Sequence, residues 1–244
     1  MPNAFAKIGA VLIAAILPLS ILAQTPQELF ELGTRAYRQS DYKTAAAYFE
    51  QSAQKGFGDA AYHNAANSYA KMSQNGLAML NYERARYLKP RSPETVANIS
   101  AISKLSGTPE KKRNFADVFF GELSNFEWAM LAICSFWIGV IIASASIMLR
   151  KSGNSVKTAM SLSSLVFIIS IAGTIYWSDM RNTAISVSQD GVLKLSPAKN
   201  APAIAPFPEG RRGIIKERRG NYLRLQTPDK KIGWAEVEYA KPVR

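Results

Sequence analysis

The sequence contains very little cysteine, histidine or acid. Its 244 residues include one Cys and one His, and 18 Asp and Glu stand against 30 Lys and Arg. One Cys excludes an internal disulfide, and a Cys/His zinc cluster is excluded because it needs about four such ligands. The net charge of +12 favours an anionic partner. Nucleic acid is the usual partner of this kind, but the compartment inferred below favours an anionic surface or protein.

Apolar residues, 48% of the chain, are concentrated in three stretches, which excludes a single soluble core. The first stretch, residues 8–22, follows Lys7 and ends at the small residue Ala23. A cation, an apolar run of about fifteen residues and a small exit residue are typical of a secretory signal peptide. We therefore predict a signal peptide over residues 1–23, and an uncleaved N-terminal anchor is the alternative. Both interpretations place the chain from Gln24 onward outside the cytoplasm.

The other two stretches, residues 126–149 and 158–177, each hold about twenty residues without a charge, enough to cross a membrane as a helix. Residues 150–157 between them carry three cations and no acid, which predicts a cytoplasmic loop. Trp128 and Trp177 lie at the outer ends, where aromatic rings favour the membrane interface. The sequence thus predicts a transmembrane hairpin in a bacterial inner membrane, with both flanking regions in the periplasm.

Residues 27–90 contain one pattern twice, with a period of 33 residues. The equivalent positions share a small or an aromatic side chain: Gly33 with Ala66, Ala45 with Ala78, and Phe49 with Tyr82. Such a period indicates stacked helix pairs. Pro90 is expected to end the last helix of the second pair. A further helix from Pro93 to Leu105, with Ser92 as its N-cap, is expected to cover the open apolar face.

This pattern resembles the tetratricopeptide repeat over about a quarter of the chain. It departs from the family at Ser52, where Ala is usual, and at residues 55–58, where Lys-Gly-Phe-Gly replaces a closing Pro. The resemblance implies an all-α solenoid over residues 24–107, built from two repeats and a capping helix. In that family the first helix of each pair lines a groove that holds a partner's peptide. Transferring those positions predicts a binding face made of Phe30, Thr34, Tyr37, Arg38, His63, Asn67, Lys71 and Lys104.

Some of the residues on this predicted binding face have side chains that could bind a peptide. Asn67 can hydrogen-bond a peptide backbone, and the three cations can pair with a carboxylate. The family's full carboxylate-binding set is not present, because Phe30 and Thr34 replace its Lys and Asn. The alternative is that these residues form a solvated helix face. His63, the lone His, is expected to be an ordinary face residue rather than a ligand or base.

Residues 182–241 change to short strand-like runs separated by turn signals. Five runs are predicted as strands: 184–187, 191–195, 213–217, 222–225 and 233–237. Five short strands within sixty residues predict a small all-β barrel. The order of strands and turns, closing with Gly233-Trp234-Ala235, resembles a bacterial SH3-type domain. Tyr222 and Trp234 are candidates for the rim of a ligand site, with packing as the alternative role.

The C-terminal region is strongly basic. Residues 178–244 carry 13 Lys and Arg against 7 Asp and Glu. We predict an anionic-surface contact to phospholipid headgroups, to cell-wall polymer such as peptidoglycan or to an acidic protein, and no nucleic acid. The alternative is a solvated strand pair that aids solubility. The contact is assigned to five cations within nine residues: Arg211, Arg212, Lys216, Arg218 and Arg219.

No combination of residues in the sequence indicates an active site. His63 has no nucleophile and acid in a recognisable arrangement with it, and Cys134 lies inside a predicted membrane helix. No Gly-rich phosphate loop follows a strand. We therefore expect no enzyme activity, no cofactor and no metal. The juxtamembrane linker, residues 108–125, is rich in large apolar residues and is expected to lie in the membrane interface or to pack against the hairpin.

The order of signal peptide, tetratricopeptide repeats, membrane hairpin and SH3-type domain resembles the BatE family of the Bat aerotolerance cluster. The resemblance rests on this order and covers nearly the whole chain. It implies von Willebrand A-type membrane partners and a role in tolerance of oxygen or envelope stress. We expect a multi-pass membrane protein that acts as a periplasmic scaffold through its repeat groove. The alternative is a cell-wall-binding sensor that acts through the SH3-type domain.

Overall fold

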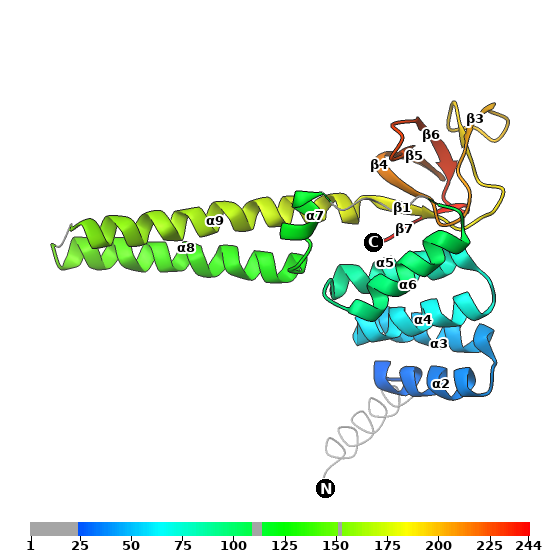
Figure 1. The fold of residues 1–244 in the computed structure, drawn as a ribbon, viewed down its shortest axis with the longest axis horizontal. Coiled ribbons are helices and arrows are strands. Elements are labelled where there is room, and N and C mark those ends of the chain that lie inside the picture. Colours follow the sequence, from blue (N-terminus) through cyan, green and yellow to red (C-terminus); the bar gives the residue numbers. More distant parts are fainter. Residues whose placement is uncertain (1–23, 109–113, 151–152) are drawn as a thin grey trace, which may run out of the picture.

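The computed structural model describes residues 24–108, 114–150 and 153–244. The predicted signal peptide, residues 1–23, lies outside the described residues. The chain forms a helical region, a long helix hairpin and a C-terminal sheet (Figure 1). The two helices of the hairpin project away from the rest of the molecule. The helical region and the sheet lie next to each other, near the end of the hairpin where α9 leads into β1 (Figure 1).

The helical region starts its helices with strong local signals. Thr25 forms a capping box with Glu28, and Asp41 and Ser92 cap later helices. The last α-helix coincides with the predicted one, and the fourth ends two residues before Pro90 because the residue before a proline avoids helical geometry. The elements are α2 (Pro26–Arg38), α3 (Tyr42–Ser52), a π-helical turn η1 (Ala53–Phe57), α4 (Asp59–Lys71), α5 (Asn75–Leu88) and α6 (Pro93–Leu105).

The same backbone turn ends α2, α4 and α6. Each has a left-handed residue after the helix: Ser40 at φ 61°, Ser73 at φ 57° and Gly107 at φ 60°. In each turn the next residue donates its backbone N–H to the carbonyl five residues earlier, at 3.0 Å: Asp41 to Ala36, Gln74 to Tyr69 and Thr108 to Ser103. This is the Schellman C-cap. Its recurrence shows that α6 is built like the first helix of a third pair.

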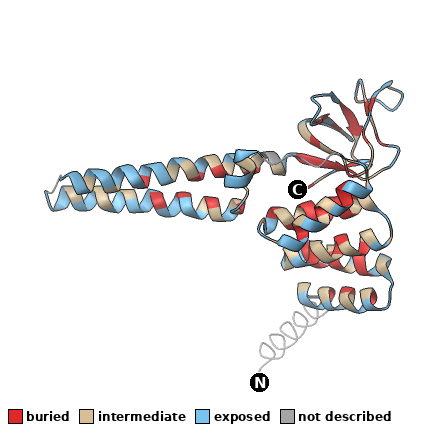
Figure 2. Ribbon diagram, in the orientation of Figure 1, coloured by how far each residue is buried: buried red, intermediate tan, exposed pale blue. Residues whose placement is uncertain are grey.

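Small residues lie where the helices approach, as the period predicted. Ala45, Ala66 and Ala78 are fully buried. A Cβ atom added at Gly33 would lie 2.8 Å from the ring of Phe49, so only glycine allows this approach without a shift. The burial pattern therefore follows the sequence pattern in α2 to α5 (Figure 2).

The hairpin consists of α8 (Asn125–Met148) and α9 (Asn154–Arg181). Both helices contain a stretch long and apolar enough to cross a membrane, Asn125–Met148 in α8 and Asn154–Ser178 in α9. α9 extends four residues beyond the predicted helix at each end. Polar and small residues bring the two helices together, since Ser163 Oγ donates to the Ser135 carbonyl at 2.5 Å.

A short helix, α7 (Phe115–Phe119), lies at the end of the hairpin where α8 begins and α9 ends (Figure 1). The indole N–H groups of Trp128 and Trp177 both donate to the Phe120 carbonyl, at 3.0 and 3.1 Å. The linker therefore packs against the hairpin, which was one of the two expected roles. The two phenylalanines of α7 nevertheless remain exposed.

The C-terminal sheet has seven antiparallel strands in the order β3-β2-β6-β5-β4-β1-β7. Their bounds are β1 (Thr183–Ser186), β2 (Val192–Lys194), β3 (Ala203–Pro206), β4 (Arg212–Arg219), β5 (Tyr222–Gln226), β6 (Ile232–Glu236) and β7 (Ala240–Pro242). The five predicted strands are present, and β3 and β7 are additional. The predicted small barrel is not confirmed, because the sheet is open: within residues 183–242 no ladder joins β3 to β7.

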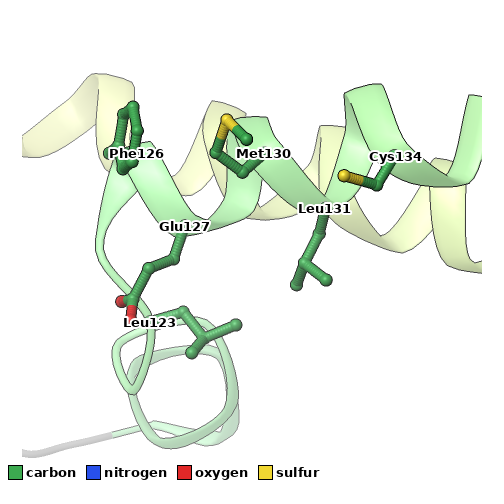
Figure 3. A pocket seen from close by; sticks show the side chains of 6 residues that line it. All are labelled: Leu123, Phe126, Glu127, Met130, Leu131 and Cys134. Atoms are coloured by element: carbon green, nitrogen blue, oxygen red, sulfur yellow. The ribbon is translucent and has the colours of Figure 1, made fainter.

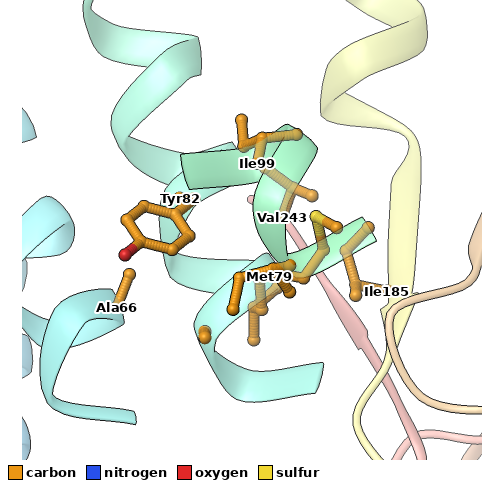
Figure 4. Packing of buried hydrophobic residues seen from close by; sticks show 9 residues of the cluster. Ala66, Met79, Tyr82, Ile99, Ile185 and Val243 are labelled. Atoms are coloured by element: carbon orange, nitrogen blue, oxygen red, sulfur yellow. The ribbon is translucent and has the colours of Figure 1, made fainter. Parts of the chain in front are cut away.

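The open end of the sheet packs on the helical region, which explains why the sheet need not close on itself. Ile185 of β1 and Val243 after β7 are buried in one cluster with Met79 of α5 and Ile99 of α6 (Figure 4). The expectation that α6 alone covers the second helix pair is therefore incomplete. Side chains from the sheet complete that cover, and the two regions share one core.

Candidate functional site

The predicted binding face lies on the three helices that end in the Schellman turn. Its aromatic and uncharged residues are half-buried, whereas Arg38, Lys71 and Lys104 are exposed. These three cations lie in the last turns of α2, α4 and α6. Because the three helix ends share one geometry, the cations occupy one end of the face.

A hydrogen-bond network fixes the centre of this face. The Tyr82 hydroxyl donates to Asn67 Oδ1 at 2.6 Å, and the Asn98 amide donates to the same oxygen at 3.4 Å. Burial raises the pKa of the Tyr82 phenol to about 12, so the hydroxyl remains a donor at neutral pH. The Asn67 side-chain oxygen thus accepts two hydrogen bonds from within the protein, and its NH₂ group can donate to a ligand.

His63 is tied to α6 rather than placed for acid–base chemistry. Its Nδ1 lies 2.9 Å from the Thr95 hydroxyl, and its ring meets Tyr82 edge-on at 5.5 Å. Burial lowers the pKa of the His63 imidazole, and the carboxylates of Glu94 and Asp59 oppose that shift only in part. The ring is therefore neutral at pH 7 and links α4 to α6.

The first-helix residues of the predicted face also make internal contacts. The Phe30 ring stacks on Phe57 at 4.5 Å and meets Phe49 edge-on at 5.3 Å. Tyr37 meets Tyr42 edge-on at 5.2 Å. These two aromatic residues hold η1 and α3 against α2, so their substitution would disturb packing as well as any ligand contact.

The five predicted anion-binding cations divide into two groups. Arg211 contacts Asp229 at 2.5 Å, and hydrogen bonds from Thr227 and Arg211 lower the pKa of that carboxylate to about 2. Arg212 forms a salt bridge with Glu83 of α5. The other three, Lys216, Arg218 and Arg219, are exposed on the far half of β4.

The Glu83 carboxylate is the centre of the junction between helices and sheet. It is fully buried and also contacts Arg86 at 2.8 Å. Burial opposes its ionisation, but Arg212 and Arg86 outweigh that effect and hold the pKa of Glu83 below its ordinary value. Nearby, the Arg84 guanidinium donates to the Val243 carbonyl at 3.1 Å.

Reading the sequence alone missed this junction. The available signal was the run from Ala78 to Tyr82, whose apolar side chains cover more than one face of α5. A helix that is apolar on several sides needs neighbours on each of them. The sequence could therefore have indicated a further partner for α5, although not which segment supplies it.

Tyr222 and Trp234, the two predicted rim residues, lie on the outward face of the sheet. In the register, Trp234 pairs with Arg224 and Lys194, whereas the buried core alternates with them on the other face. The Arg219 guanidinium lies 5.5 Å from the Trp234 ring centroid. Trp234 is nonetheless only 8% exposed, with the Arg219 guanidinium over its ring.

A shallow apolar hollow of about 400 Å³ lies beside the outer end of α8 (Figure 3). Its lining includes Phe126, Met130 and Cys134, all exposed, with Glu127 at one side. Glu127 pairs with Arg91 of the helical region at 2.5 Å. The hollow faces away from α9 and belongs to the surface that a bilayer would cover.

Within residues 24–108, 114–150 and 153–244, no group of three His, Cys, Asp or Glu side chains is arranged to hold a metal ion. Comparison with models of known protein families and with curated protein sequences gives no match. Function is therefore inferred from the residues and their geometry.

Proposed function

We propose that this chain is a membrane-anchored periplasmic scaffold whose predicted binding face holds a segment of a partner protein. The observation that carries the proposal is the arrangement around Asn67. Its amide is oriented by Tyr82 and Asn98, and exposed cations follow at the ends of three equivalent helices. A fixed amide donor beside unburied cations suits an extended segment with acidic side chains.

The anchor makes this contact effective. The two apolar helices hold the face next to the membrane, so a membrane partner meets it at high effective concentration. The shared core of helices and sheet supports this role, because a face fixed to its anchor loses less entropy on binding than one on a flexible tether.

We extend the proposal to family membership on the order of the parts. The helix pairs are assigned to the tetratricopeptide repeat, the sheet to an open variant of the SH3-type domain, and the chain to a BatE-like role with von Willebrand A-type membrane partners. The recurring Schellman turn, spaced 33 and then 34 residues apart, supports the repeat assignment. Oxygen or envelope-stress tolerance is part of this proposal and rests on the family resemblance alone.

Copurification from detergent-solubilised membranes tests the scaffold. The variant Arg38→Ala/Asn67→Ala/Lys71→Ala removes the donor and two cations without touching Phe30 or Tyr37, whose rings support the fold. A matched control, Lys43→Ala/Gln51→Ala, changes exposed residues of α3. We expect a defined membrane partner to be lost in the first variant and retained in the second. Retention of the same partners in both would overturn the proposal.

A second candidate function is cell-wall sensing, favoured by the cation-covered Trp234 on the outward sheet face. The full chain in detergent would then sediment with insoluble peptidoglycan. Retention in high salt would separate a specific site from simple charge attraction. Release of the chain at moderate salt would exclude this candidate.

A further inference from the structure

Strand β4 runs back toward the membrane hairpin. β1 begins at Thr183, with only Asn182 between it and the end of α9, and pairs antiparallel with β4 through Thr183 and Ile214. β4 then continues to Arg219, past the start of β1, and the Ile215 N–H donates to the Asn182 carbonyl at 2.6 Å. Five residues beyond Ile214 extend the strand by roughly 16 Å. In Figure 1 this hairpin of β4 and β5 lies at the side of the sheet nearest α9.

The returning end of the strand pair carries a concentrated positive charge. We call Lys216, Arg218, Arg219 and Arg224 the basic tip, and all four are exposed. Between residues 216 and 224 the sequence has a single acid, Glu217. Glu217 forms ion pairs with Arg219 at 3.2 Å and with Arg224 at 3.5 Å. Both pairs are exposed to solvent, and such pairs are weak. The basic tip therefore keeps most of its charge available.

The same end of the molecule carries the residues that mark a membrane interface. Trp128 and Trp177 lie at the outer end of the hairpin, and α7 presents exposed Phe115 and Phe119 beside them. From Trp177 to the end of α9 the helix rises by only about 6 Å. A long arginine on the returning strand therefore lies within reach of the headgroup layer that surrounds the hairpin.

We propose that the basic tip binds the headgroups of anionic phospholipids in the leaflet next to it. This rests on the part of the proposed function in which α8 and α9 cross the membrane. Lipid is favoured over a soluble partner because the chain itself fixes the tip beside the bilayer. Guanidinium groups match phosphate oxygens with two parallel hydrogen bonds. Each cation near an anionic membrane surface contributes about a fivefold increase in binding.

Native mass spectrometry of the full chain in detergent tests the proposal, with phosphatidylglycerol or phosphatidylcholine added. The test variant is Lys216→Gln/Arg218→Gln. The matched control, Lys230→Gln/Lys231→Gln, removes two exposed cations from the turn at the opposite end of β5. We expect wild type and control to retain phosphatidylglycerol in preference to phosphatidylcholine, and the test variant to lose this preference. No preference in wild type, or equal losses in both variants, would overturn the proposal.

A second measurement separates lipid binding by the basic tip from the proposed membrane anchor and the proposed scaffold role. A fluorescent dye is attached to the cysteine of Asn221→Cys, in a Cys134→Ser background. Its fluorescence is measured in nanodiscs whose lipids carry spin-labelled headgroups, which quench a nearby dye. Quenching that is strong in phosphatidylglycerol discs and weaker in phosphatidylcholine discs supports binding to anionic headgroups. A chain that resists alkaline extraction but shows no quenching overturns the basic tip alone, and a chain released by alkali overturns the membrane anchor as well. Partner copurification of Lys216→Gln/Arg218→Gln reports on the scaffold independently and is expected to be unchanged.

Discussion

The two halves of β4 carry similar cations in opposite surroundings. Arg212, at the start of the strand, bridges to the buried carboxylate of Glu83 and joins the sheet to α5. Arg218, near its end, is exposed and faces solvent. The eight residues of β4 thus run from a buried contact with α5 to a surface exposed to solvent.

This comparison shows that a count of cations cannot assign their roles. A buried ion pair is costly to break, because removal of one partner leaves the other charge without a counter-ion in a poorly solvated place. An exposed cation contributes little to stability and is available to a ligand. The difference between the two halves of β4 comes from whether another element covers the strand.

Removal of the buried carboxylate should give the largest effect. Glu83→Ala leaves Arg212 and Arg86 without their counter-charge and should lower the free energy of unfolding by about 3–5 kcal/mol. Circular dichroism of the full chain during thermal unfolding in detergent measures the shift. Glu217→Ala at the exposed half is the control, with an expected change within about 0.5 kcal/mol. Equal shifts would show that the junction is not closed.

A methyl group at Gly76 tests the junction through the sign of its effect. A Cβ atom there would lie 2.7 Å from the Ser186 carbonyl oxygen, a backbone atom that cannot swing aside. Gly76→Ala should therefore destabilise the chain by about 1–3 kcal/mol. In a helix without this neighbour, the same change would stabilise by up to about 1 kcal/mol. A rise in melting temperature would mean that the sheet does not pack on α5.

Acid should weaken the junction around Glu83. The pKa of Glu83 is lower in the folded chain than its ordinary value near 4.5, so its contribution is present above that pH and is lost as the pH falls below it. The free energy of unfolding, measured between pH 7 and pH 3, should fall in the acid range. Glu83→Gln should flatten that part of the curve, and an unchanged slope would contradict the assignment.

Loss of the exposed cations should have the smallest effect on stability. Lys216→Ala/Arg218→Ala should change the free energy of unfolding by less than about 0.5 kcal/mol, because neither residue is buried. Thermal unfolding without added lipid measures this. A loss above 1 kcal/mol would assign these residues a structural role and weaken the contrast between the two halves.

Local patterns in the sequence predicted most of the helices and strands. The 33-residue period, the N-cap at Ser92 and the two apolar stretches can each be recognised without knowing which distant segments pack together. β3 and β7 escaped prediction because they are short and lie in Pro- and Ala-containing segments. Their strand geometry comes from ladders with β2 and β1 rather than from their own propensity.

The sites were harder to predict because burial depends on segments distant in sequence. Arg212 and Arg218 look equivalent until α5, more than a hundred residues earlier, covers one of them. Likewise Phe30 was assigned to a ligand face, and only the fold shows that its ring stacks on Phe57. The exposed cations Arg38, Lys71 and Lys104 remain predictions for partner binding, and their positions suit that role.

The pairing of β1 with β7 has a consequence for the biogenesis of the molecule. Helices α2 to α6 precede the hairpin in the sequence, but the side chains that complete their core, Ile185 and Val243, follow it. During synthesis the apolar face of α5 therefore stays uncovered until the hairpin and the strands that follow it have been made. Such a face invites aggregation or chaperone capture in the interval. The order of elements along the chain therefore makes the docking of β1 and β7 on α5 the last step in completing the shared core.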